Sequence, residues 1–391
     1  MDTLGLYVSV PFCRAKCSFC NFASGVFAAG RMQSYVDRVC SEIETAQMRS
    51  QHLKAYLPET VDTIYLGGGT PSLLAPEQIR QIFEAVRRNF KVVVGAEITL
   101  EAAPGQLAEA TLTEAMRHGM NRVSFGVQSF VDRELAAIGR LHTREMCGRE
   151  IERMRASGLS ISVDLIAGLP YQTEKSWSDS LEEAIALKVP HISVYMLEVD
   201  EESRLGHEML AGGTRFHAHA VPSDDISADL YMMACVRLEA AEIEQYEISN
   251  FARNGWSSRH NLKYWRRQPY LGFGMDAHSM LRTEETAIRF CNTDDLDAYQ
   301  ASARAGEPVH LTVQEAFEEA LFLGLRLKGG VSVEALRREF AAGMVQECAE
   351  ALVELEEEQL LETRDGGWRL TLRGRLLSNE VFSRLLLPVA V

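Results

Sequence analysis

Six strand-like segments alternate with five helix-like segments over the first half of the chain, and this rhythm constrains the fold more than any other feature. The strand-like segments are rich in Val, Ile and Tyr, and they span Leu4–Pro11, Val61–Gly68, Ala96–Ala103, Arg122–Ser129, Ser160–Gly168 and His191–Val199. The segments between them have helical apolar periodicity, and they span Met32–His52, Pro76–Phe90, Gln106–His118, Thr143–Ser157 and Glu174–Leu187. Such alternation predicts right-handed crossovers and a parallel sheet. Six units fall short of the eight that close a barrel, so an incomplete barrel and a doubly wound sheet both fit.

The rhythm changes after about residue 200. Residues 201–225 look like a loop, Ile226–Glu242 predicts a helix, and residues 246–251 could form another strand. A short Ala/Gly/Pro-containing stretch at residues 301–308 predicts a linker. We therefore expect one domain over residues 1–300 and a second over residues 309–391.

The second domain is expected to be small and mostly helical. Helices are predicted at Val313–Leu327, Val333–Phe340 and Glu347–Glu358, followed by the hairpin sequence LLETRDGGWRLT and one more helix. Helices followed by a β-ribbon resemble a winged helix, a fold that often binds DNA. Acidic residues outnumber basic ones in this tail, which favours a docking or lid role over DNA binding.

Charge and hydropathy narrow the range of partners and locations. The 391 residues include 40 Lys and Arg against 55 Asp and Glu, a net charge of −15. Such a surface repels phosphate backbones, so no nucleic-acid partner is expected. The N-terminal sequence MDTLGLYVSVPFC lacks a secretory signal pattern, and the chain has no apolar run of about 20 residues, so we expect a cytoplasmic protein.

Three of the eight cysteines form a cluster immediately after the first strand. Cys13, Cys17 and Cys20 follow the spacing C-x3-C-x2-C, with no fourth cysteine or histidine in the loop. Structural zinc normally takes four ligands in two separated pairs. Three thiolates can instead hold three corners of a [4Fe–4S] cluster and leave the fourth iron open to a small molecule. A zinc site completed by a distant residue is the alternative.

This motif resembles the radical S-adenosylmethionine (SAM) superfamily. The resemblance implies a [4Fe–4S] cluster whose open iron is chelated by the amino and carboxylate groups of SAM. The sequence Gly67-Gly68-Gly69-Thr70-Pro71 follows the second strand, where that superfamily has a glycine-rich turn that holds the amino group of SAM. Glycines let backbone amides approach a ligand closely. No Gly-Lys-Ser/Thr follows, so this is not a nucleotide-binding P-loop.

Within this superfamily, the chain is similar to the coproporphyrinogen III oxidase-like family over nearly its whole length. The matching stretches are residues 7–13, 67–72, 124–129, 164–170 and 191–195. The resemblance implies an incomplete (β/α)6 barrel with a small helical, winged-helix-like C-terminal domain. It also implies a set of SAM contacts: Tyr7, Phe19, Gly68, Gly69, Thr70, Glu101, Gln128, Arg140 and Asp164.

The family includes an oxygen-independent oxidase and a heme chaperone, and three features separate them. The oxidase pattern has a fourth cysteine two residues after the third, where this chain has Phe22, and it has a long N-terminal extension. The sequence His260-Asn-Leu-Lys-Tyr264-Trp265 matches the HNxxYW motif of the chaperone, whose histidine is a proposed heme ligand. The resemblance therefore favours a heme chaperone. Oxidative decarboxylation of coproporphyrinogen III is the alternative function, and a structural role is the alternative for His260.

The resemblance also sets the expected partners: heme, heme-accepting apo-proteins and, where SAM is cleaved, an electron donor. Transient membrane association and a homodimer stay open.

Two further motifs have specific interpretations. In the stretch LGFGMDAHS at residues 271–279, Asp276 replaces the usual glycine. Asp tolerates a positive φ at this position better than most residues. No clear strand is expected before this stretch within a βαβ unit, so NAD binding is not expected. The pair His217 and His219 is interpreted as part of a solvated loop.

Overall fold

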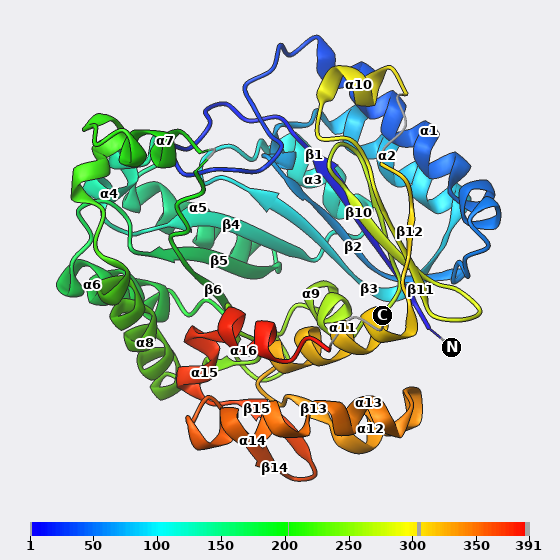
Figure 1. Ribbon diagram of the computed structural model, residues 1–391. Coiled ribbons are helices and arrows are strands. Elements are labelled where there is room, and N and C mark those ends of the chain that lie inside the picture. The colour runs from blue at the N-terminus through cyan, green and yellow to red at the C-terminus, as the bar shows by residue number, and fades with distance from the viewer. Residues whose placement is uncertain (1, 202, 303–305, 388–391) are drawn as a thin grey trace.

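The computed structural model describes residues 2–201, 203–302 and 306–387. In this part of the chain, six parallel strands form the centre of a 12-stranded sheet: β1 (Leu4–Val10), β2 (Thr60–Gly68), β3 (Lys91–Ala102), β4 (Arg122–Gln128), β5 (Ser160–Ala167) and β6 (His191–Met196). These six strands lie side by side in chain order. A doubly wound sheet would reverse that order at a switch point. The incomplete barrel is therefore confirmed (Figure 1).

The crossover helices cover the outer face of this curved sheet. They are α1 (Arg31–His52), η1 (Pro71–Leu73), α2 (Pro76–Asn89), α3 (Glu109–Arg117), α4 (Asp132–Ala137), α5 (Arg144–Ala156) and α6 (Glu174–Ala186). Thr173 illustrates why they start where they do, because its side chain accepts from the Ser176 N–H and caps α6. Among the described helices, each is too short or too polar to cross a lipid bilayer.

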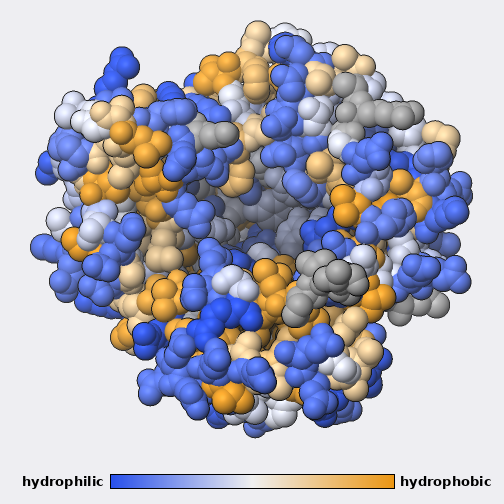
Figure 2. Space-filling model, in the orientation of Figure 1, coloured by the Kyte–Doolittle hydropathy of each residue, from blue (hydrophilic) through white to orange (hydrophobic). Residues whose placement is uncertain are grey.

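Strand periodicity makes the barrel apolar outside and polar inside. In β1, Leu4, Leu6 and Val8 point to the helix layer and are fully buried, whereas Tyr7 and Ser9 alternate with them and line the interior. The same alternation places a series of polar residues on the inner face of the other strands: Thr63, Tyr65, Glu97, Thr99, Glu101, Arg122, Ser124, Ser162, Asp164, His191 and Ser193. Figure 2 shows that the molecule is hollowed at its centre in this view. A polar interior of this kind suits a charged ligand.

Short strands extend both edges of the parallel core. β9 (Tyr270–Phe273) pairs in parallel with β1, and β10 (His278–Arg282), β11 (Ala287–Cys291) and β12 (Val309–His310) follow in antiparallel order. At the other edge, β8 (Asn250–Ala252) and β7 (Glu244–Gln245) follow β6. The LGFG stretch begins inside β9, which covers Leu271, Gly272 and Phe273. A strand and not a helix comes next, so the stretch still lacks the βαβ context of a dinucleotide site.

The segment after β6 holds more helix than the sequence predicted. The predicted loop over residues 201–225 contains α7 (Arg204–Leu210) and η2 (Arg215–Ala220), and residue 202 lies outside the described residues. The predicted helix is present as α8 (Asp224–Ala240), and α9 (Arg259–Trp265) and α10 (Leu296–Gln300) follow. Residues 303–305 of the predicted linker also lie outside the described residues.

The C-terminal elements form a second core below the sheet in Figure 1. They are α11 (Val313–Arg326), β13 (Val331–Ser332), α12 (Val333–Glu339), α13 (Ala342–Glu347), α14 (Ala349–Glu357), β14 (Leu361–Arg364), β15 (Gly367–Leu370), α15 (Leu372–Leu376) and α16 (Ser378–Arg384). The strand order β13-β15-β14 beside these helices agrees with the expected winged-helix-like fold. Ion pairs fix this core to the barrel, with Arg267 2.8 Å from Glu339 and Arg289 2.5 Å from Glu319. The exact domain boundaries stay a prediction.

Candidate functional site

The three-cysteine loop leaves the carboxyl end of β1 and is held there by backbone hydrogen bonds. The Cys13 N–H donates to the Gly25 carbonyl at 2.9 Å, and the Cys20 N–H donates to the Cys17 carbonyl at 3.3 Å. The Ser18 carbonyl accepts from the Leu205 N–H of α7 at 2.9 Å, so α7 braces the loop from outside. All three thiols are half-buried.

The number and kind of ligands in this loop suit a [4Fe–4S] cluster with one open iron, because the loop offers three thiols and no fourth ligand. Within the described residues, no three His, Cys, Asp or Glu side chains are grouped as the ligands of a single metal ion. A [4Fe–4S] cluster takes each thiolate at a different iron, so its ligands are spread out. Burial raises the pKa of Cys13 and Cys17, while the nearby Arg140 guanidinium favours the Cys17 thiolate. A bound metal would deprotonate these thiols.

The glycine turn after β2 is pinned against the cysteine loop. The Gly69 N–H donates to the Val10 carbonyl at 2.9 Å, and the Thr70 N–H donates to the Phe12 carbonyl at 2.8 Å. A Cβ atom on Gly69 would lie 2.8 Å from the Val10 carbonyl oxygen, so this close approach requires glycine. The Thr70 hydroxyl lies 3.7 Å from Cys13 Sγ. The turn and the cysteines therefore form one rim.

Two carboxylates face the barrel interior below this rim. Glu101 accepts from the Tyr65 hydroxyl at 2.7 Å and from the Gly68 N–H at 3.1 Å. Burial raises the pKa of Glu101 to about 7, with the Tyr65 hydrogen bond opposing it and Asp164 adding to it. Burial likewise raises the pKa of Asp164 to about 6. The Ser193 hydroxyl and the Arg140 guanidinium oppose this shift, because both favour the charged carboxylate. Among the described residues, no cation offsets Glu101, so a cationic ligand such as SAM would relieve this desolvation.

The other predicted SAM residues lie around the same end of the barrel. Tyr7 stacks near Tyr65 with ring centroids 6.1 Å apart. Gln128 ends β4 with a φ of 70°, and Arg140 reaches in over Gly126, where an added Cβ would lie 2.7 Å from the guanidinium. Phe19, in the cysteine loop itself, packs in an apolar cluster formed with Ile138, Ile166, Leu169 and Leu197. The sequence alone offers no reason to select Gly126. Its lack of a side chain matters only because the Arg140 side chain, from the loop after α4, lies over it.

His260 lies at the other end of the barrel interior. Its neighbour Thr63 on β2 pairs with Gly5 of β1 and Glu97 of β3. Thr63 and Glu97 each come four residues before Gly67 and Glu101 on the same strands. Four residues correspond to roughly 13 Å along a strand. The Nδ1 atom is 2.9 Å from the Thr63 hydroxyl, and Nε2 is 2.8 Å from the Tyr264 hydroxyl. Burial lowers the pKa of His260 to about 3, so its imidazole is neutral at physiological pH.

The aromatic side chains of the HNLKYW motif already have partners. Tyr264 meets Tyr270 edge to face with centroids 4.6 Å apart, and the Arg326 guanidinium lies 4.5 Å from the Trp265 ring centroid. His260 itself is 1% exposed. The motif is thus closed in this structure, and a macrocycle would need α9 to rearrange.

A second histidine, missed from the sequence as a site residue, has the same environment. His191 is also 1% exposed, with Nδ1 2.6 Å from the Ser162 hydroxyl and Nε2 2.9 Å from the Tyr246 hydroxyl. Burial lowers its pKa well below the usual range. Its sequence signals are its place at the start of a strand with a polar inner face and in the family-like stretch at residues 191–195.

The remaining positions behave as surface features. His217 and His219 lie on η2, are exposed, and have ring centroids 6.4 Å apart, while the Tyr171 hydroxyl lies 2.8 Å from His217 Nδ1. Phe22 is 64% exposed beside the cysteine loop. Asp276 has a φ of 58°, so it adopts the positive φ that Asp tolerates better than most residues.

A singly wound parallel barrel with a three-cysteine loop beside a glycine turn defines the radical SAM class of proteins. The family model "Radical SAM superfamily" matches residues 7–184, and "HemN C-terminal domain" matches residues 311–377. The radical SAM family implies a [4Fe–4S] cluster and SAM.

Two relatives are similar to this chain over almost its whole length. The Heme chaperone HemW of Bacillus subtilis is 34% identical over 387 residues, which cover 97% of this chain and 98% of the relative. The Heme chaperone HemW of Lactococcus lactis is 32% identical over 386 residues, covering 97% of both chains.

The chain belongs to the HemW family of radical SAM proteins. Among solved structures, it is similar to coproporphyrinogen III oxidase (HemN) from Escherichia coli, with a TM-score of 0.82 and 23% identity. That likeness covers 98% of this chain and 90% of HemN, and it supports the fold. The predicted family and fold are confirmed.

Proposed function

We propose that this protein is a heme chaperone that binds heme and delivers it to apo-proteins. The observation that carries the proposal is the near full-length similarity to two relatives that are each named Heme chaperone HemW. Phe22, at the position of the fourth cysteine in the oxidase pattern, also supports it over coproporphyrinogen oxidation. We place this activity in the cytoplasm.

The cluster and SAM belong at the carboxyl ends of β1–β5 in this proposal. Cys13, Cys17 and Cys20 would hold the cluster, whose fourth iron would bind the amino and carboxylate groups of SAM. Gly68, Gly69 and Thr70 would offer backbone groups to the amino acid part of SAM. The remaining contacts would come from the barrel interior and rim: Tyr7, Phe19, Glu101, Gln128, Arg140 and Asp164.

His260 is the proposed heme ligand. A neutral imidazole is the form that binds a metal, and burial keeps His260 neutral above about pH 4. Iron at Nε2 would have to displace the Tyr264 hydroxyl, which now occupies that nitrogen. Heme binding through His260 therefore requires α9 to move from the wall of the barrel.

The pair His260 and His191 provides a matched test of this assignment. Both side chains are buried, neutral and bonded to one Ser or Thr hydroxyl and one Tyr hydroxyl. We expect His260→Ala to shift the Soret band and weaken heme binding by at least tenfold, and His191→Ala to leave both unchanged. Iron and sulfide content of the reconstituted cluster should be equal in the two variants. A His260→Ala protein with the wild-type heme spectrum and affinity would disprove the ligand assignment.

The other partners follow from this function. Cleavage of SAM would need a one-electron donor, so an electron-transfer protein is a proposed partner only if SAM is turned over. Contact with a membrane and formation of a homodimer are further proposals. Both can be measured directly, by vesicle flotation and by sedimentation of the reconstituted protein.

A further inference from the structure

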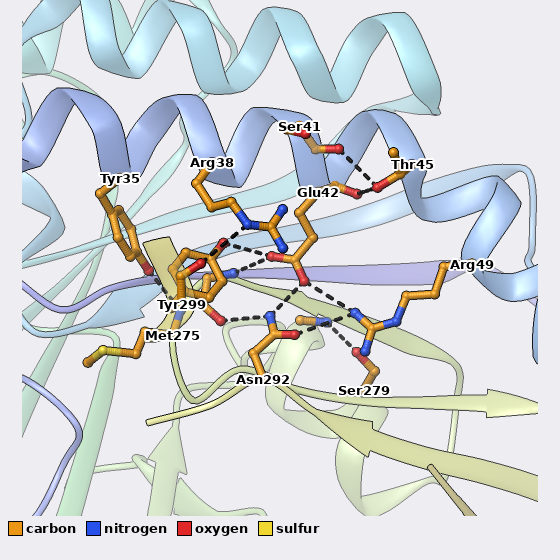
Figure 3. Close-up of polar contacts among 12 residues, drawn as sticks. Tyr35, Arg38, Ser41, Glu42, Thr45, Arg49, Met275, Ser279, Asn292 and Tyr299 are labelled. Carbon is orange, nitrogen blue, oxygen red and sulfur yellow. Dashed lines mark hydrogen bonds and ion pairs between the residues drawn. The ribbon is translucent and has the colours of Figure 1, made fainter. Parts of the chain in front are cut away.

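A buried carboxylate in the middle of α1 connects the first crossover helix to the segment that follows β9. Glu42 is 5% exposed, and its side chain points to that segment (Figure 3). Its Oε1 accepts from Asn292 Nδ2 at 2.6 Å, and its Oε2 accepts from the Tyr299 hydroxyl at 2.8 Å and from the Gly274 N–H at 3.0 Å. Arg49 Nη1 lies 3.3 Å from Oε1 and balances the charge.

The donors to Glu42 come from three separate places in one segment. Gly274 is in the turn after β9, Asn292 follows β11, and Tyr299 is on α10. A buried charge is costly unless its acceptor sites are filled, and here several donors fill them. Glu42 therefore fixes the turn, the strand end and the short helix relative to α1.

Tyr35, about two turns earlier on α1, connects the same turn to β1. Its hydroxyl donates to the Ser9 carbonyl at 2.7 Å and accepts from the Met275 N–H at 2.9 Å. Gly274 has a φ of 96°, and a Cβ there would lie 2.5 Å from both the Ser9 carbonyl oxygen and the Tyr35 hydroxyl. The turn is thus pressed against the end of β1.

This contact brings the turn beside the glycine turn of the SAM site. Ser9 pairs with Gly67 of β2, and a Cβ on Gly68 would lie 3.0 Å from Ser9 Oγ. Burial and the charge of Glu101 raise the pKa of Tyr7, and Asp276 of this turn is close enough for its charge to add to that effect. One strand, β1, therefore separates the turn at residues 274–276 from the glycine turn that would bind SAM.

We propose that Glu42 and Tyr35 are positioning residues for SAM. They touch no part of the predicted cofactor, but they set the position of residues 274–276 as a wall of its site. This inference rests on the proposed function, since it requires that SAM binds at the glycine turn. Loss of either anchor lets the wall move away from β1 and weakens SAM binding, while the cysteines keep the cluster.

The test compares three variants of the full chain after anaerobic cluster reconstitution. Glu42→Gln places an amide where two donors now point, and Tyr35→Phe removes the hydroxyl bridge but keeps the ring. Glu247→Gln is the control, because Glu247 is also a buried carboxylate, bonded by the Ser249 N–H at 3.2 Å and by Asn250, near the opposite edge of the sheet. Tyr35→Phe preserves packing, so it keeps the test valid if Glu42→Gln does not fold.

We expect SAM dissociation constants to rise about tenfold in Glu42→Gln and Tyr35→Phe, as is usual when groups that orient a site are removed. Iron content should equal that of the wild type, and Glu247→Gln should bind SAM normally even if its melting temperature falls. Wild-type SAM affinity in Tyr35→Phe would overturn the proposal, as would an equal loss in Glu247→Gln. Failure of the wild-type protein to bind SAM would instead overturn the SAM site itself.

Discussion

Glu101 should make the free energy of unfolding depend on pH in a direction opposite to that of a salt-bridged carboxylate. Its ordinary pKa of 4.5 rises to about 7 in the folded protein because the side chain is desolvated. The folded state therefore holds a proton that the unfolded state has already lost between about pH 4.5 and pH 7. The stability from this group is fully present below pH 4.5 and is lost as pH rises through 7.

The size of the effect follows from the shift. A difference of about 2.5 pKa units corresponds to about 3 kcal/mol at 1.36 kcal/mol per unit. Because Glu101 is half-buried at the open end of the barrel, water can reach it, and about 2 kcal/mol is a more realistic loss. Asp164, whose pKa is raised to about 6, contributes in the same direction and titrates together with Glu101.

The perturbation is Glu101→Gln, which keeps the shape and removes the titration. Urea unfolding without SAM at pH 5, 6, 7 and 8 gives a stability curve for each protein. We compare the free energies of unfolding of Glu101→Gln and wild type. From pH 5 to pH 8, we expect the variant to gain about 2 kcal/mol of stability relative to wild type. Taking this difference removes the opposite contribution of His191 and His260, whose lowered pKa values are common to both proteins.

A parallel pair of stability curves would refute the reasoning, because it would mean that Glu101 has an ordinary pKa. The pH-dependent difference in the free energy of unfolding should disappear when the wild-type protein is saturated with SAM. A cationic ligand favours the charged carboxylate, so binding should restore the normal titration of Glu101.

Two further predictions concern the cluster and the turn at Asp276. Cys17→Ala should lose most of the iron and sulfide after reconstitution, whereas the buried Cys147→Ala should keep them; equal iron content in the two variants would contradict the cluster assignment. Asp276→Gly should raise the free energy of unfolding by about 0.5–1 kcal/mol, because the φ of 58° costs a non-glycine residue more than glycine. Urea unfolding checks this, and a less stable glycine variant would show that the Asp276 side chain is itself stabilising.

The parallel core could be predicted because its two periodicities are local. Apolar residues alternate along β1, and helical spacing marks α1, so both elements start within one residue of their predicted positions. The strands β9 to β12 were missed because they are short, and β9 contains one glycine and is followed by another, a pattern typical of a turn. They are strands only because the edge of β1 is available to pair with them.

The candidate site was predictable to the extent that it follows strand ends. Glu101 and Gln128 lie where parallel strands finish, so their neighbourhood follows from the topology. The burial of His260 could not be predicted, because its partner Thr63 is 197 residues away in the sequence. Glu42 and Tyr35 look like ordinary helix positions until the fold brings residues 274–299 against α1.

The central claim is that the protein carries heme and does not oxidise coproporphyrinogen. The direct measurement is a side-by-side anaerobic assay of one cluster-reconstituted preparation with SAM and a reductant. One sample receives coproporphyrinogen III, and the other is loaded with heme and mixed with an apo-hemoprotein. We predict that heme moves to the apo-protein and that coproporphyrinogen III stays unchanged. Steady formation of protoporphyrinogen IX without heme transfer would contradict the account.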